Sequence, residues 1–132
     1  MPGAYKSQND LISETLKNLG VLAAGNAADP EDFTYVQEKV DPTIRALASL
    51  DICYIGDPDQ IPGELFNALA DVLAGECASK FGSTPEDRIA LTAKGLGGPP
   101  SQVEYGAGSG AKALRQINRG RPTYETAKVL TF

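Results

Sequence analysis

A helix-start pattern that occurs twice constrains the fold of this chain more than any other feature. Residues 29–32 read Asp-Pro-Glu-Asp and residues 84–87 read Thr-Pro-Glu-Asp. The capping side chain accepts a backbone N–H, proline fits the first helical position, and the acids suit the positive end of the helix dipole. Each pattern therefore predicts the start of a helix.

Apolar residues at helical spacing follow these starts and two others. Ser7 and Asp10 resemble a capping box, and Pro62 opens the longest pattern, which runs to Phe81. We expect helices over 7–19, 30–50, 62–81 and 84–94, and a short basic helix over 111–119. The predicted fold class is all-α: a small bundle of four to five helices with an extended C-terminal arm.

Two segments of the predicted bundle depart from simple helical patterning. Pro42 has no N–H and clashes with the preceding turn, so we expect a kink or a restart at Asp41. Residues 51–55 (Asp-Ile-Cys-Tyr-Ile) are rich in β-forming types and end at a turn, so they form either a short strand or an extended buried connector.

Charge divides the chain into two unequal parts. Residues 1–92 hold 6 Lys/Arg against 15 Asp/Glu, a net charge of −9, whereas residues 93–132 hold 6 against 2, a net charge of +4. We therefore divide the chain into an acidic helical bundle (1–94), a Gly/Pro-rich hinge or loop (95–110), the basic helix (111–119) and an extended arm (120–132). The overall charge of −5 argues against a general nucleic-acid binder.

The glycines between residues 95 and 110 do not match a phosphate-binding loop. Such a loop needs a preceding strand and a Gly-Lys-Ser/Thr ending, and neither is present. We interpret the stretch as a flexible linker.

The residue types that most enzymes use are scarce. The chain has no histidine, and its two cysteines, Cys53 and Cys77, are not arranged as a zinc-binding pair. Both lie in apolar surroundings, which favours buried free thiols. Acidic pairs lie in first turns, where capping explains them. We expect no catalytic residues, no cofactor and no metal, and we find neither a secretory leader nor a membrane span.

The basic C-terminal part carries the residues that we expect to bind a partner. Its arginines and aromatic residues suit either an acidic protein surface or a nucleic acid, and the acidity of the bundle favours the protein. The candidate partner-binding residues are Arg119, Arg121, Pro122, Tyr124, Val129, Leu130 and Phe132.

The order of these parts resembles the head-to-tail adaptor family of tailed bacteriophages, also called head completion proteins or tail accessory factors. The resemblance rests on residues 9–21, on residues 61–70 with the helix end at 81–82, and on residues 121–125 (Arg-Pro-Thr-Tyr-Glu). The chain departs from the family at 95–110, where many relatives continue as a longer helix.

This resemblance implies a structural role in the virion, with assembly in the host cytoplasm. Copies of the chain, usually twelve, would form a ring beneath the portal protein, extend the DNA channel without sequence-specific DNA binding, and offer a platform to a tail or nozzle protein. Residues 120–132 would bind the portal, and the bundle would supply contacts between copies. The inter-subunit candidates are Leu11, Leu16, Tyr54 and Arg115.

A second hypothesis stays open at this point. The chain would then be a small helical regulatory or nucleic-acid-associated protein whose basic tail binds DNA or RNA, with an affinity that falls steeply with salt.

Overall fold

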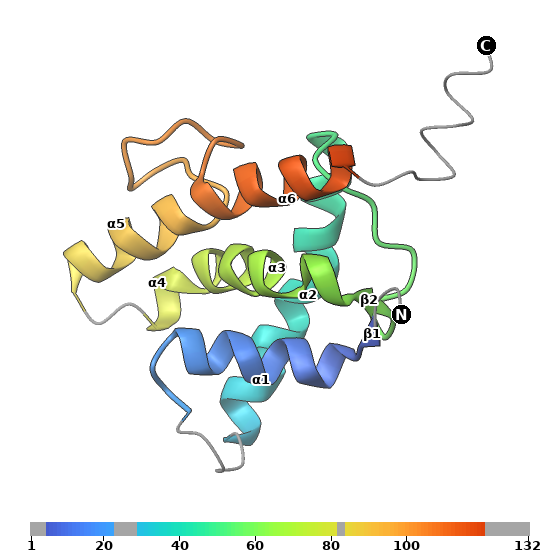
Figure 1. Cartoon of the computed structure of the whole chain (residues 1–132). Coiled ribbons are helices and arrows are strands. Elements are labelled where there is room, and N and C mark those ends of the chain that lie inside the picture. The colour runs from blue at the N-terminus through green and yellow to red at the C-terminus, as the bar shows by residue number, and fades with distance from the viewer. Residues whose placement is uncertain (1–4, 23–28, 82–83, 121–132) are drawn as a thin grey trace, which may run out of the picture.

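The computed structural model describes residues 5–22, 29–81 and 84–120, and the side chains of 118–120 lie outside this description. Within these ranges the chain forms six helices and two short strands (Figure 1). In chain order they are β1 (Tyr5–Lys6), α1 (Gln8–Asn18), α2 (Pro30–Ser49), β2 (Ile61–Pro62), α3 (Gly63–Glu76), α4 (Ala78–Phe81), α5 (Pro85–Lys94) and α6 (Ser109–Gly120). The predicted all-α fold class is confirmed.

Helix α3 lies at the centre of the bundle. It contacts α1 on one side and α5 and α6 on the other, while α2 crosses behind it (Figure 1). Its leucines Leu65, Leu69 and Leu73 are buried, as are Ile12 of α1 and Leu47 of α2. One apolar core therefore extends through the bundle. Within the described residues, no helix combines the length and apolar character needed to cross a membrane.

Three of the predicted helix starts are confirmed in atomic detail. The Ser7 hydroxyl accepts the Asp10 N–H at 3.1 Å, and the Asp10 carboxylate accepts the Ser7 N–H at 3.2 Å, which completes a capping box. Asp29 accepts the Glu31 N–H at 2.9 Å at the start of α2. Thr84 accepts the Asp87 N–H at 3.1 Å at the start of α5.

Of the two alternatives expected at Asp41, a kink or a restart, the restart is wrong, because helix α2 continues through Pro42. Pro42 and Glu38, whose carbonyl loses its helical donor, are both exposed, so the missing hydrogen bond lies at the surface rather than in the core. The helix expected from Pro62 to Phe81 ends at Glu76, and α4 comes next as a separate turn. The Phe81 ring then packs edge-to-face on Tyr35, with the ring centroids 5.6 Å apart.

The segment after α2 is the buried connector, one of the two alternatives expected from its sequence. Ile52 and Cys53 are buried, and residues 51–55 form no strand. The strand pairing occurs elsewhere, between β1 and β2, which run antiparallel with Tyr5 opposite Pro62 and Lys6 opposite Ile61. Two residues per strand give no sequence pattern, so this pairing escaped prediction.

The glycine-rich stretch is a packed loop, which corrects the prediction of a flexible linker. The N–H groups of Gly106 and Gly108 donate to the Leu96 carbonyl at 2.7 and 3.1 Å, and Leu96 is buried. A Cβ on Gly97 would lie 2.5 Å from the Glu104 carbonyl oxygen, and a Cβ on Gly108 would overlap the Gly95 carbonyl. These glycines are required for close packing rather than for mobility.

The loop fixes α6 to the bundle. Ala111 and Leu114 are fully buried, and α6 packs along α3. The basic helix is therefore part of the bundle. The change of charge near residue 95 does not mark a boundary between two separately folded parts.

Helix α5 packs on α3 in a different way from helix α1. Gly75 of α3 faces Gly95 at the end of α5, and a Cβ on Gly75 would lie 2.9 Å from the Leu91 carbonyl oxygen and 3.1 Å from the Gly95 Cα. No residue of α5 is buried, and Ile89, which belongs to its apolar pattern, is 43% exposed. The backbones meet so closely that the side chains of α5 remain at the periphery.

Candidate functional site

Most of the residues predicted to bind a partner fall outside the described part of the chain. Arg121, Pro122, Tyr124, Val129, Leu130 and Phe132 lie beyond residue 120. Arg119 belongs to the last turn of α6, and its side chain is not described.

Two of the four inter-subunit candidates lie in the core of the chain. Leu11 and Leu16 are each 1% exposed, because the apolar stripe of α1 packs on α3 and α2. A buried side chain has no surface to offer to a second copy. Their assignment to a contact between copies is therefore corrected: they hold α1 in its own bundle.

The other two candidates lie at the surface, but both make contacts within the chain. Tyr54 is 55% exposed, and its hydroxyl donates to the Asp51 carboxylate at 2.9 Å, a bond that raises the pKa of the phenol. Arg115 is partly buried and donates from Nη1 to the Gly106 carbonyl at 3.2 Å. Arg115 therefore ties α6 to the packed loop and is not a free cation.

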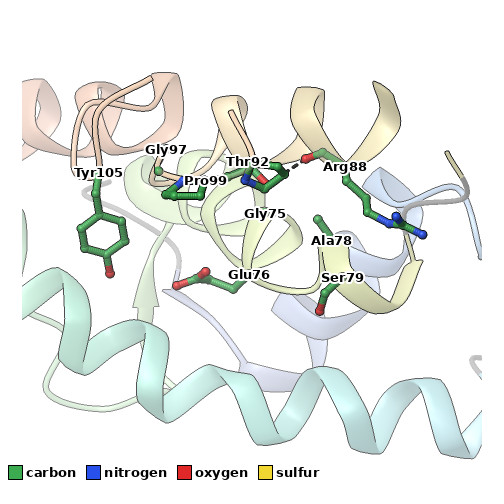
Figure 2. A pocket seen from close by; sticks show the side chains of 11 residues that line it. Gly75, Glu76, Ala78, Ser79, Arg88, Thr92, Gly97, Pro99 and Tyr105 are labelled. Carbon is green, nitrogen blue, oxygen red and sulfur yellow. Dashed lines mark hydrogen bonds between the residues drawn. The ribbon is translucent and has the colours of Figure 1, made fainter. Parts of the chain in front are cut away.

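A pocket opens where α3, α4, α5 and the packed loop meet (Figure 2). Its volume is about 330 Å³, at the lower end of the range of small-molecule sites. The floor is formed by glycines from α3 and the loop. The larger side chains around it are Glu76, Ser79, Arg88, Thr92, Pro99 and Tyr105.

The two ends of this pocket differ in charge. Figure 2 shows the Glu76 carboxylate directed toward the hydroxyl end of Tyr105, while the Arg88 guanidinium points away at the opposite end. The Arg88 carbonyl accepts the Thr92 hydroxyl at 2.7 Å. Burial raises the pKa of Glu76, and the charge of Lys39 only partly opposes this. Burial and the nearby charge of Glu76 raise the pKa of Tyr105.

The other described groups with shifted pKa values do not combine with the pocket residues into a catalytic site. Burial raises the pKa of the Cys77 thiol to about 12, which keeps it protonated and unreactive at neutral pH. Burial and then the charge of Glu14 raise the pKa of Asp71, against the opposing charge of Lys94. Within the described ranges, no three His, Cys, Asp or Glu side chains lie close enough to hold a metal ion.

Sequence reasoning missed that Glu76 and Tyr105 face each other in this pocket (Figure 2), although a signal for Glu76 existed. Several acidic residues lie in the first turns of helices, whereas Glu76 ends α3, where the helix dipole disfavours a negative charge. An acid in that place needs another reason to be there. Tyr105 gave no comparable signal, because its position depends on the packed loop.

Comparisons with protein-family models, with curated proteins and with solved structures found no match to this chain.

Proposed function

We propose that this chain is a structural head-to-tail adaptor of a tailed bacteriophage, which forms a ring beneath the portal protein. The ring, with twelve copies as the expected number, extends the DNA channel and offers a platform to a tail or nozzle protein. The observation that carries the proposal is the contrast between an acidic bundle and a basic C-terminal part that begins on a helix fixed to that bundle.

The attachment of α6 supports a docking role for the segment beyond its end. Ala111 and Leu114 are buried against α3, and Arg115 is bonded to the packed loop, so the end of α6 has a defined position. Residues 121–132 carry Arg121 and Lys128 against Glu125, together with Tyr124 and Phe132. A basic segment with aromatic anchors suits an acidic protein surface.

The acidic surface of the bundle supports the channel role. Glu31, Glu38 and Asp41 are exposed along α2, and a wall of negative charge would repel DNA and let it slide. The side chain of Arg115, by contrast, is partly buried and donates to the Gly106 carbonyl, which makes it less accessible to a nucleic acid.

The test is portal binding by a chain truncated before Gly120. We expect the truncated chain to lose ring formation on the portal of the same phage and to keep its helical circular dichroism. Tyr124→Ala and Phe132→Ala should each weaken binding, whereas Tyr5→Ala, which removes a 64% exposed aromatic from the bundle, should leave it unchanged. Undiminished ring formation without residues 120–132 would contradict the proposal.

A further inference from the structure

The carboxylate of Glu76 is a half-buried charge that needs a counter-ion. Burial raises its pKa, and Lys39 offsets this only in part. Among the described residues, the one cationic charge found to act on this carboxylate is that of Lys39. Charged groups that lose contact with water are normally paired, so a cation that enters the pocket from outside the described residues would offset the cost of burying this carboxylate.

The surroundings of Glu76 suit a guanidinium better than an ammonium group. Tyr105 is 51% exposed beside the carboxylate (Figure 2). Pro99 and Pro100 are exposed on the same loop. A planar guanidinium can pair with a carboxylate through two N–H groups and stack on an aromatic ring, which a compact ammonium cannot do. The flanking prolines offer a surface for an extended segment.

We propose that the Glu76–Tyr105 pocket binds Arg121 from a second copy of this chain, so that the C-terminal segment of each copy fastens it to its neighbour. The segment 121–124 (Arg-Pro-Thr-Tyr) supplies the cation, a rigid proline and an aromatic ring, and its charge is opposite to that of Glu76. The inference rests on the self-assembly in the proposed function. It assigns Arg121 to the contact between copies and leaves the residues from Tyr124 onward to the portal.

The course of α6 favours a second copy over the same chain. The helix starts at the packed loop, close to the pocket, and runs back along α3 toward the end where β2 lies (Figure 1). Twelve helical residues span roughly 18 Å. The described part of α6 therefore ends near the end of α3 opposite to Glu76, which favours the pocket of a neighbouring copy for the segment that follows Gly120 in sequence.

A charge exchange in the full-length chain tests this pairing. Glu76→Arg and Arg121→Glu should each weaken self-association by roughly tenfold or more, because each variant brings like charges together. An equimolar mixture of the two variants should associate again, since the arginine introduced into the pocket of one variant then meets the glutamate introduced into the C-terminal segment of the other. Sedimentation velocity from micromolar to millimolar concentration measures all three samples beside the wild type.

Two further variants separate the pairing from folding and from general charge. Glu76→Gln keeps the shape of the side chain and should also weaken association, with unchanged circular dichroism. Glu104→Arg makes the same charge change at an exposed residue outside the pocket and should leave association as in the wild type.

The outcomes are decisive in both directions. Association restored in the mixture supports the inference. A mixture that stays monomeric, which is the result expected if the segment docks within its own chain or only on the portal, overturns it, as does a wild type that is monomeric at every concentration. Because no portal is present, failure here leaves the portal-binding test intact, and loss of portal binding leaves this one intact.

Discussion

The two sides of α3 are held by different kinds of contact. On the α1 side, large apolar side chains interlock: Leu11, Ile12 and Leu16 are at most 1% exposed. On the α5 side, the backbones of Gly75 and Gly95 touch, and no α5 side chain is buried. The first contact depends on apolar area removed from water, whereas the second depends on the absence of a Cβ. Substitutions that remove side-chain atoms should therefore lower stability most on the α1 side. Substitutions that add atoms to a glycine should lower it most on the α5 side.

The largest expected effect is on the α1 side. Ile12→Ala should lower the free energy of unfolding by about 2–5 kcal/mol, because it leaves a cavity under a fully buried side chain. Urea denaturation monitored by circular dichroism measures this loss. Lys17→Ala, at an exposed position of the same helix, serves as the control and should change the free energy little.

On the α5 side the damage should come from adding one methyl group. Gly75→Ala should cost about 1–3 kcal/mol, because the new Cβ would lie 2.9 Å from the Leu91 carbonyl oxygen and α5 would have to shift. Gly56→Ala is the matched control, since a Cβ there meets nothing within 4 Å. Equal stability of the two variants would show that the backbones do not approach as closely as described.

A third prediction concerns Asp71, which lies between the two sides. It accepts a hydrogen bond from Asn18 of α1 at 3.3 Å and lies near Lys94 of α5. Its pKa is raised in the folded state, mainly by burial, so this residue favours folding most at a pH below its unfolded pKa. That contribution is lost as the pH rises through the folded pKa.

Asp71→Asn should therefore raise the melting temperature at pH 7 and lose this advantage in acid. The gain should stay below about 1 kcal/mol, because water still screens the carboxylate. Thermal unfolding of both chains between pH 3 and pH 7 measures it. A variant that is less stable than the wild type at pH 7 would show that attraction to Lys94 outweighs burial.

The smallest effect is expected at Ile89. Ile89→Ala removes the same atoms as Ile12→Ala, but its side chain is 43% exposed, and alanine has the higher helix propensity. We expect a change within about 0.5 kcal/mol of zero, as for most surface substitutions. A loss comparable to that of Ile12→Ala would remove the contrast between the two sides.

The same contrast explains which parts of the fold were predictable from sequence. The α1 side carries a capping box and an apolar stripe, and both correctly predicted a helix. The α5 side depends on Gly75, Gly95 and Gly108. The sequence alone does not distinguish a glycine that is needed for close packing from a glycine in a flexible linker. The partner of each glycine is set by tertiary structure, so the sequence left residues 95–110 as a hinge or loop and did not reveal their close packing.

The pocket was not predictable for the same reason. Glu76 lies at the end of an apolar helix, and Tyr105 comes from a loop whose path depends on glycine contacts far along the chain. Neither residue forms a motif by itself. Tyr54 and Arg115 were expected to meet other copies, but their bonds to Asp51 and to the Gly106 carbonyl within the chain were not readable from sequence.

The position of α1 has a consequence for how the chain leaves the ribosome. Helix α1 is synthesised first, yet its apolar side is covered mainly by α3, which ends at Glu76. At typical translation rates, the interval between the completion of the two helices is roughly 3–12 s. During that time the apolar side of α1 lacks the cover that α3 provides, and α2 is the only other helix available to pack on it, so the nascent chain passes through a stage that is open to chaperones and to aggregation.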